Sequence, residues 1–477
     1  MVSEEDNCGM SLLKAAIVFK YYEPEVSFVY FKRKIYDELL SWKKNSDGKS
    51  AALIEGARRV GKSTTVLEFA QNEYDDYILL DFATESKDVK DNFKDNIGDL
   101  NTFFRNLFAI KGKELVKRKS VIVFDEVQLF PPARQAIKYL VADGRYDYIE
   151  TGSLISIKRN VKNILIPSEE EKLKMFPMDF EEFLWAKGNN ATMPIVKEAF
   201  DNKKPLGDMV HRNVMRLFRE YITVGGMPQA VMEYVKGESY SDIDMVKQGI
   251  LSLYEDDLKK YDEEEKEKAS LIFRTIPRQL SDHYMHFTFS EINTNARYVN
   301  YVDSVEFVAE SMIGNLCANV TMPDVLMELY ADRSNFKLYM GDTGLLVSQM
   351  IRSGDETEGI YRALIFDKLS SNLGMIFENV VAQMLKSRGN ELYFHEYKYT
   401  PDDSDKEKKY EIDFLLVKDK KVCPIEVKSS GYKSHKSFDY FVQKYPTKIQ
   451  DRYIIYTKDL KCSEGITYIP AYMTAFL

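Results

Sequence analysis

The stretch that decides the fold is residues 51–69, which read AALIEGARRVGKSTTVLEF. Its first apolar residues predict a buried strand, and apolar residues at helical spacing after Lys62 predict a helix. Between them lies the pattern G-x-x-x-x-G-K-[ST], whose glycines allow a tight turn that points backbone N–H groups at phosphate oxygens. The helix N-terminus adds partial positive charge. We therefore expect a phosphate-binding loop (P-loop) formed by Gly56, Ala57, Arg58, Arg59, Val60, Gly61, Lys62, Ser63 and Thr64.

A second stretch, residues 121–128 (VIVFDEVQ), has the features of a strand that ends in acidic residues. Four consecutive apolar residues suit a strand buried on both faces of a parallel sheet. It ends on Asp125 and Glu126. Beside a P-loop, Asp125 and the Ser63 hydroxyl are expected to hold Mg²⁺, and Glu126 to orient and deprotonate the attacking water. The structural alternative is an acidic pair that only caps the strand.

Two further positions belong to this predicted site. Residues 151–153 (TGS) follow another expected strand, 146–149, and Ser153 is a candidate sensor of the terminal phosphate, with a structural turn as the alternative. Glu150 is unexpected, because a strand end at this place is usually apolar. Arg33 lies in an expected helix over 29–42, where it either approaches the nucleotide or is solvated.

Composition sets broad limits on function. A chain of 477 residues is long enough for two to four domains. The net charge of −9 argues against a chain-wide coat for nucleic acid but leaves a local basic groove open. The four cysteines have no metal or disulfide spacing, which suits a reducing compartment. The acidic start, MVSEEDNCGM, is unlike a signal peptide, and there is no apolar run of about 18 residues. We expect a cytoplasmic protein with no membrane partner.

The C-terminal part carries a second set of carboxylates. Residues 375–385 predict an amphipathic helix bearing Glu378, and residues 410–417 (YEIDFLLV) a strand bearing Asp413. In the next strand, 422–428 (VCPIEVK), Glu426 and Lys428 are two apart and share one face. If the strands form a hairpin, Asp413 and Glu426 can hold Mg²⁺ or Mn²⁺, with Glu378 nearby and Lys428 orienting water. The alternative is a fold kept for binding, with the carboxylates engaged in salt bridges to Lys428.

Several motifs in order resemble one family. GARRVGKST, VIVFDEVQ, TGS, FPMDFEEFL (176–184) and GGMPQAV (225–231) look like AAA-type ATPases of bacteria and archaea that carry a restriction-endonuclease-like C-terminal domain. The D…E-x-K spacing is similar to that of PD-(D/E)xK nucleases, although Ile412 takes the place of proline before Asp413. In such proteins the PMDFEEFL stretch links the core to the lid; the alternative for its acidic residues, Asp179, Glu181 and Glu182, is a solvated face and helix N-terminal charges.

The resemblance implies an α/β fold with four parts. These are an AAA-type P-loop NTPase core with a parallel sheet (1–175), a helical lid (176–260), a winged-helix-like module (261–355) and a restriction-endonuclease-like α/β domain (356–477). From the residues alone, a hairpin is expected within 325–346. In related ATPases the winged-helix module often contacts DNA, but here it has no basic stripe, so a spacer role is the alternative.

The expected function is that of an ATP-binding and ATP-hydrolysing protein that acts on or near DNA. The alternative is a nucleotide-switched binding protein whose nuclease-like domain is inactive; a small-molecule kinase would leave the second carboxylate set without a role. Expected partners are ATP or ADP, DNA, and a second copy of the chain or another protein. No arginine finger can be assigned, and Arg58 and Arg59 are candidates for ligand contact.

Lysines and aromatic rings near the C-terminal site suit DNA, with a solvated mixed surface as the alternative. They are Lys398, Lys406, Lys408, Lys409, Lys433, Lys436, Tyr397, Tyr399, Tyr410, Tyr432 and Phe438, interrupted by Asp402, Asp403 and Asp405.

Overall fold

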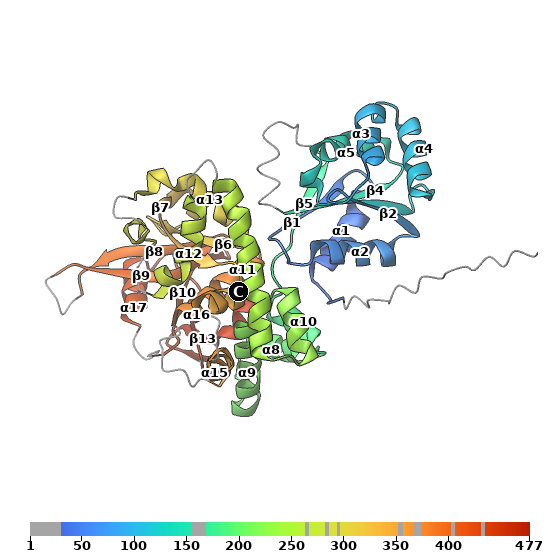
Figure 1. The fold of residues 1–477 in the computed structure, drawn as a ribbon. Helices are drawn as coiled ribbons and strands as arrows, with labels where there is room; N and C mark the ends of the chain where they lie inside the picture. The colour runs from blue at the N-terminus through green and yellow to red at the C-terminus, as the bar shows by residue number, and fades with distance from the viewer. Residues whose placement is uncertain are drawn as a thin grey trace, which may run out of the picture. The chain divides into compact units, whose positions relative to one another are not determined.

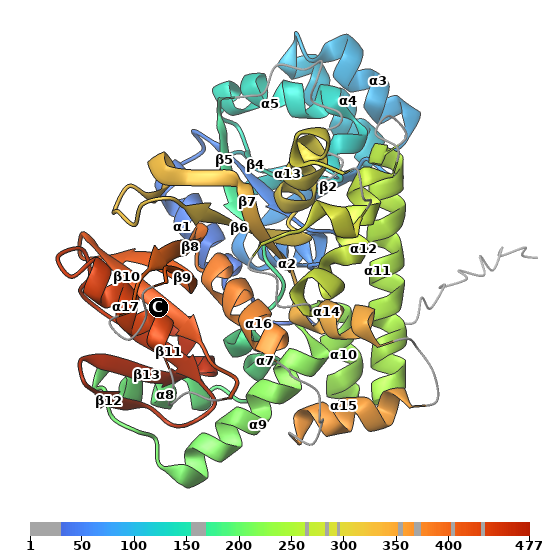
Figure 2. The same cartoon turned by 90° about the vertical axis from the view of Figure 1, so that its left-hand side faces the viewer.

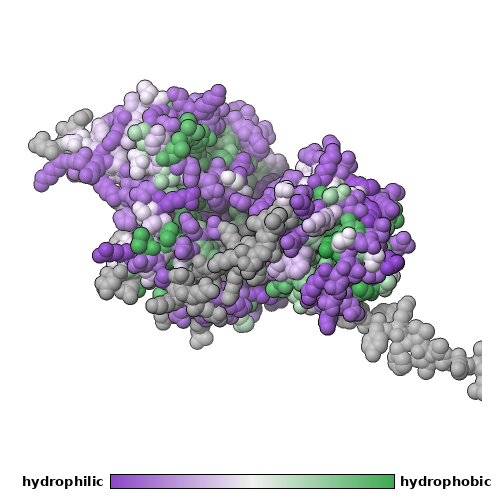
Figure 3. Space-filling model, turned by 90° about the horizontal axis from the view of Figure 1, so that it is seen from above, coloured by the Kyte–Doolittle hydropathy of each residue, from purple (hydrophilic) through white to green (hydrophobic). Residues whose placement is uncertain are grey.

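Two β-sheets, formed by separate stretches of the chain, organise the protein (Figure 1). The computed structural model describes residues 30–153, 168–262, 267–281, 286–292, 296–351, 356–366, 374–401, 406–430 and 435–477. None of the helices in these ranges is long and apolar enough to cross a membrane. The face drawn in Figure 3 is mostly hydrophilic, and its hydrophobic side chains lie in small separate patches.

The first sheet has five parallel strands in the order β2-β3-β4-β1-β5. The strands are β1 (Ala51–Gly56), β2 (Asp76–Asp81), β3 (Ser120–Asp125), β4 (Asp147–Ser153) and β5 (Glu170–Lys174). The apolar runs of β1 and β3 are buried, as strands covered on both faces must be. The expected parallel α/β sheet is confirmed.

Helices cover both faces of this sheet (Figure 1). On one side lie α1 (Ile35–Ser46) and α2 (Lys62–Glu73). On the other lie α3 (Lys87–Asn96), α4 (Leu100–Lys111) and α5 (Pro131–Asp143), with a short 3-10 turn, η1 (Val127–Leu129), before α5. Along β1, Ala52 and Ile54 join the first helical layer, whereas Ala51 and Leu53 join the second. Because helices cover both faces of the sheet, the carboxyl ends of its strands form the edge at which side chains can lie together.

A run of helices follows where a lid was expected. It comprises α7 (Phe180–Ala186), α8 (Thr192–Asp201), α9 (Asp208–Val224), α10 (Pro228–Lys236) and α11 (Tyr240–Asp262). The FPMDFEEFL motif is the start of α7: Asp179 caps this helix and forms a reciprocal capping box with Glu182. Its acidic residues therefore act as helix N-terminal groups, one of the two roles expected for them.

The second sheet has eight strands in the order β12-β13-β11-β10-β9-β8-β6-β7. They are β6 (Gly314–Val320), β7 (Ala331–Met340), β8 (Leu392–Tyr399), β9 (Lys408–Lys418), β10 (Lys421–Val427), β11 (Tyr453–Tyr456), β12 (Lys461–Ser463) and β13 (Ile466–Pro470). The helices of this region are α12 (Lys268–Ser281), α13 (Val302–Glu310), α14 (Thr343–Met350), α15 (Thr357–Ile365), α16 (Gly374–Ser387) and α17 (Lys436–Lys444). Four 3-10 turns complete it: η3 (Phe289–Glu291), η4 (Tyr298–Asn300), η5 (Met327–Tyr330) and η6 (Ala471–Phe476).

This sheet corrects the expected organisation of residues 261–355. The hairpin expected within 325–346 is instead β6 paired with β7, and residues after β7 turn into α14. β6 also pairs with β8 in parallel, so strands from both sides of the expected boundary at residue 356 belong to one sheet. Cys317 of β6 lies opposite Leu392 of β8 in this pairing, which a separate wing would not allow. α16 packs on one face of this sheet and α17 on the other (Figure 2).

Gly226, between α9 and α10, lies against the backbone just before α7 and is hydrogen-bonded to Asp342, the N-cap residue of α14. The N–H of Gly226 donates to Asp342 Oδ2 at 2.6 Å, and the N–H of Met178 donates to Gly226 O at 2.7 Å. A Cβ on Gly226 would lie 2.1 Å from Met178 O, so the backbone itself would have to move. Only glycine fits this crossing.

We predict that Gly226→Ala lowers the free energy of unfolding by about 1–3 kcal/mol, as overpacking does. The matched control is Gly249→Ala, because a Cβ on Gly249 in α11 meets nothing within 4 Å. That control should be neutral or stabilise by up to about 1 kcal/mol, since alanine is the better helix former. Urea unfolding of both variants measures the difference; equal effects at the two positions would contradict the close approach.

Candidate functional site

The loop between β1 and α2 is held in a special backbone conformation. Arg59 and Gly61 have positive φ angles of 69° and 99°. The guanidinium of Arg33 donates to Val60 O at 2.7 Å and to Phe176 O at 2.6 Å. Arg33 is only 4% exposed, so the expectation that it is solvated was wrong, whereas its approach to the nucleotide stays a prediction. Its role is to fix the loop backbone from within the protein.

Lys62 places its ammonium group inside this loop. Its Nζ donates to Gly56 O at 3.0 Å and to Ala57 O at 2.9 Å, and the residue is 7% exposed. Burial lowers the pKa of Lys62 to about 8, although Glu126 and Asp125 act to raise it. The ammonium group therefore has only neutral hydrogen-bond partners and would gain from an anion.

The two predicted Mg²⁺ ligands lie side by side. The Ser63 hydroxyl donates to Asp125 Oδ1 at 2.8 Å, and the Thr151 hydroxyl donates to the same oxygen. These residues come from α2, β3 and β4, whose ends meet at one edge of the sheet. A hydroxyl and a carboxylate are hard oxygen ligands of the kind that Mg²⁺ prefers, so this pair fits the ion.

Glu126 follows Asp125 in a left-handed conformation, with φ of 51°. Its N–H donates to Thr151 Oγ1 at 3.4 Å, and its carboxylate accepts a hydrogen bond from the side-chain amide of Gln128. Gln128 and Thr151 are therefore positioning residues; Thr151 belongs to the TGS segment noted in the sequence, but neither residue was assigned this role. Their signal was weak, because a polar residue after a strand is common in any turn.

Ser153 and Glu150 are not part of this cluster. Ser153 pairs in register with Gly56, but it is 4% exposed and its hydroxyl has no hydrogen-bond partner within the described ranges. Its predicted role as a phosphate sensor stays a prediction. Glu150 is fully buried; burial and the neighbouring Glu170 raise the pKa of Glu150 well above its usual range, while Arg134 opposes this. Glu150 therefore belongs to the interior of the sheet.

The P-loop also contacts the long helix α11. Arg58 Nη1 lies 3.1 Å from both carboxylate oxygens of Asp257, and the Tyr254 hydroxyl donates to Arg58 O at 2.8 Å. Arg59 is exposed. Arg58, expected to contact a ligand, is thus already paired, and a ligand would have to compete with Asp257 for it.

The predicted C-terminal hairpin is present. β9 and β10 are antiparallel, and Phe414 pairs with Ile425, so Asp413 and Glu426 occupy adjacent positions. Asp413 Oδ2 accepts a hydrogen bond from the Val427 N–H at 2.7 Å. Removal of the carboxyl from solvent, together with Glu378 and Glu426, raises the pKa of Asp413 well above its usual range. The three predicted carboxylates are therefore close enough to repel one another.

Each of the other carboxylates is engaged by a lysine. Glu426 Oε1 lies 2.5 Å from Lys428 Nζ and accepts a hydrogen bond from the Ser437 hydroxyl of α17. Glu378 Oε1 lies 3.0 Å from Lys337 Nζ, and the Tyr339 hydroxyl donates to the same oxygen at 2.5 Å. Across the described ranges, no group of three or more His, Cys, Asp or Glu side chains is arranged to hold a metal ion. As arranged here, the predicted metal ligands do not fit an ion.

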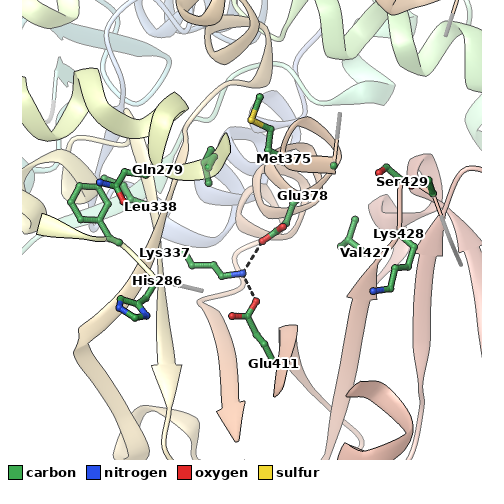
Figure 4. A pocket seen from close by; sticks show the side chains of 14 residues that line it. Gln279, His286, Lys337, Leu338, Met375, Glu378, Glu411, Val427, Lys428 and Ser429 are labelled. Carbon is green, nitrogen blue, oxygen red and sulfur yellow. Dashed lines mark hydrogen bonds and ion pairs between the residues drawn. The ribbon is translucent and has the colours of Figure 1, made fainter. Parts of the chain in front are cut away.

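Lys337 and its second partner, Glu411, were missed from the sequence. Lys337 Nζ lies 2.5 Å from Glu411 Oε1 and bridges it to Glu378 (Figure 4). A signal was present: in FKLYM (336–340) a lysine interrupts an apolar strand, and Tyr339 shares its face two residues on. Because 325–346 was assigned to a separate wing, these residues were not placed beside Glu378.

The expected base-stacking surface is occupied by other rings. Tyr397 stacks on Tyr410 with centroids 5.8 Å apart, and Tyr399 stacks on Tyr440 at 4.7 Å. Phe438 is fully buried. The rings pack on one another because they line the core beneath α17. Positions 402, 403, 405, 432 and 433 lie outside the described residues.

Comparison with solved structures finds chains of low sequence identity. The Walker-type ATPase PABY2304 of Pyrococcus abyssi is 14% identical, with a TM-score of 0.37 over 68% of this chain and 96% of that chain. Cdc6p from Pyrobaculum aerophilum is 11% identical, with a TM-score of 0.26 over 72% and 97%. A signal-transduction ATPase with a tetratricopeptide-repeat sensor from Pyrococcus horikoshii is 12% identical, with a TM-score of 0.25 over 76% and 46%.

Sequence comparison matches the chain in three segments. A search of curated proteins finds no match. Residues 215–356 match a domain of unknown function (DUF8612), and residues 373–473 match another (DUF4143). Residues 48–184 match an AAA domain, and they contain the parallel sheet, the P-loop and the Ser63–Asp125 pair. Residues 48–184 therefore resemble an AAA domain, and the parallel sheet and P-loop within them have the form of an ATPase-like P-loop domain.

Proposed function

We propose that the protein binds ATP with Mg²⁺ at the P-loop and hydrolyses it. The observation that carries this proposal is the contact of 2.8 Å between Ser63 Oγ and Asp125 Oδ1, formed beside Lys62 and Glu126 at one edge of the parallel sheet. In a P-loop enzyme, a hydroxyl and a carboxylate of this kind hold Mg²⁺, and a neighbouring lysine binds the phosphates.

Each residue has a distinct role in this proposal. The backbone N–H groups of the loop and the start of α2 bind the phosphate oxygens, and Lys62 exchanges its two carbonyl partners for them. Ser63 and Asp125 would hold Mg²⁺, which neutralises charge on the phosphates. Glu126 accepts a proton from water, and the Gln128 amide keeps its carboxylate in place.

The contacts of α11 support a nucleotide switch. Phosphate at the loop attracts Arg58, which Asp257 of α11 now holds. The same helix reaches the C-terminal region: Lys247 Nζ donates to Thr223 O at 2.8 Å and to Gly344 O at 3.1 Å. Arg58 and α14 therefore contact the same helix, through Asp257 and Lys247 respectively.

For the C-terminal domain we propose a nuclease-like site that acts on or near DNA. The hairpin that places Asp413 next to Glu426 and Lys428, with Glu378 on α16, supports it. The second candidate, a nucleotide-switched binding protein that does not cut, is favoured by the lysine partners of Glu378 and Glu426. An assay of supercoiled DNA with Mg²⁺ or Mn²⁺, with and without ATP, separates them. Cutting that is lost in Asp413→Ala supports the nuclease; no cutting under any condition supports the binding protein.

The first prediction concerns the Lys62 proton. With its pKa at about 8, Lys62 is about half protonated at pH 8, and bound phosphates raise that pKa. ATP binding at pH 8 should therefore take up about half a proton, and binding at pH 6 should take up almost none through this group. Calorimetry in buffers of different ionisation enthalpy measures the uptake.

Two variants test the assignment. Lys62→Met should weaken ATP binding at least tenfold, about 1.4 kcal/mol, and remove the uptake. Lys62→Arg keeps the charge at both pH values and should bind without uptake. Equal uptake in the wild type and Lys62→Arg would show that another group titrates.

A second prediction concerns hydrolysis. Glu126→Gln keeps the size of the side chain but removes the base, so it should retain ATP binding and slow turnover by roughly 10²–10⁴-fold. Gln128→Leu keeps the carboxylate and removes only its hydrogen-bond partner, so its loss should be smaller. Phosphate release and ATP affinity are measured for both. Unchanged turnover in Glu126→Gln would place the base elsewhere.

A third prediction tests the link to α11. Asp257→Ala frees Arg58 for the phosphates and should tighten ATP binding by up to about fivefold, since an ion pair of this kind contributes up to about 1 kcal/mol. The neighbouring Asp256, which pairs with Lys259, provides the control, and Asp256→Ala should leave the affinity unchanged. Weaker binding in Asp257→Ala alone would mean that the ion pair supports the loop and does not compete with ATP.

A further inference from the structure

The C-terminal carboxylates already have a cation, and the chain itself supplies it. Lys337, in the middle of β7, is 8% exposed and contacts Glu378 Oε1 at 3.0 Å and Glu411 Oε1 at 2.5 Å (Figure 4). Burial by itself would lower the pKa of Lys337, but Glu378 and Glu411 hold it well above its usual range. Two carboxylates within ion-pair distance of one buried amine favour its ammonium form.

The neighbours of Lys337 fix this arrangement. The Tyr339 hydroxyl shares Glu378 Oε1 with the ammonium group, so two donors from β7 hold one carboxylate oxygen. The Lys337 Nζ also lies 5.4 Å from the centroid of the Phe394 ring, at a cation–π distance. Lys337 thus contacts two carboxylates and one aromatic ring, more partners than an exposed lysine in a chance ion pair would have.

The carboxylates nonetheless keep unused acceptors. Glu426 is 2% exposed, yet among the residues that the structure describes its Oε2 has no hydrogen-bond partner, and the same holds for the buried Oε2 of Glu411. A cavity of about 360 Å³ lies beside them, lined by Lys337, Glu378, Glu411 and Lys428 among others. Buried carboxylate oxygens without donors are costly, so these oxygens could ligate a cation once the ammonium group of Lys337 has moved away.

We propose that Lys337 is the resident cation of this carboxylate site, and that a divalent metal ion binds there only after the ammonium group has left Glu378 and Glu411. Two cations at one pair of carboxylates repel each other, and the ion would need the oxygens that Lys337 and Tyr339 now occupy. This inference rests on the proposed nuclease-like site, but it concerns occupancy of the site and not cutting.

In the experiment, Mn²⁺ is titrated into the full-length chain without nucleotide, and calorimetry measures the heat of binding. Lys337→Met replaces the ammonium group by an apolar group of similar length. It should bind Mn²⁺ at least tenfold more tightly than the wild type, and adding Asp413→Asn to that variant should remove the gain. Lys386→Met is the matched control, because Lys386 lies on α16 like Glu378 but pairs with Glu391 at the surface. An equal affinity in Lys337→Met and the wild type, or an equal gain in Lys386→Met, contradicts the proposal.

The wild type gives a second, independent test if Lys337→Met does not fold. It should bind Mn²⁺ at this site no more tightly than about millimolar, the weak end of the range for carboxylate sites. Micromolar binding that Asp413→Asn abolishes would overturn the proposal without any change at Lys337.

DNA cutting is read separately in the same preparations. If Lys337→Met binds Mn²⁺ more tightly but no DNA is cut, the result supports Lys337 as the resident cation and contradicts the nuclease proposal. Metal-dependent cutting by the wild type, with no gain in Mn²⁺ affinity in Lys337→Met, supports the nuclease and removes the resident lysine.

Discussion

A buried ammonium group must find partners for its charge, and this constraint separates the two candidate sites. Within the part of the chain that the structure describes, Lys62 donates to two carbonyl oxygens, and burial lowers its pKa to about 8. Lys337 has two carboxylates, and its pKa is held well above its usual range. The first lysine is poised to receive an anion, whereas the second is already neutralised. At the P-loop the lysine ammonium group can therefore bind an anion, whereas at the C-terminal site it already forms an internal ion pair.

The fold supplies these surroundings through close backbone packing. Asp342 is buried, caps α14 through the Leu345 N–H at 3.0 Å, and accepts the N–H of Gly226 at 2.6 Å. Gln383 of α16 binds the Thr343 N–H at 2.8 Å. The lid helices, α14 and α16 are therefore joined by buried polar contacts, and α16 is the helix that carries Glu378. The positions of the C-terminal carboxylates therefore depend on these polar contacts as well as on the β9–β10 hairpin.

The sequence predicted what local patterns determine. The P-loop, the acidic end of β3, the helix with Glu378 and the β9–β10 hairpin follow from periodicity and turn residues within short windows. The partners of those residues did not follow, because they come from distant parts of the chain. Lys337 lies 41 residues before Glu378 and 74 before Glu411, and Asp257 lies 199 residues after Arg58. The pairing of β6 with β8, a parallel crossover, brought the strand bearing Lys337 next to this site, and no local signal specifies such a register.

The most direct measurement is anomalous diffraction from crystals of the full-length protein grown with Mn²⁺ and a non-hydrolysable ATP analogue. The account predicts a manganese peak beside Ser63 and Asp125, and no peak between Glu378, Asp413 and Glu426 while Lys337 contacts Glu378. A manganese ion among those C-terminal carboxylates with Lys337 still in place, or an analogue bound without any manganese beside Ser63, would contradict it.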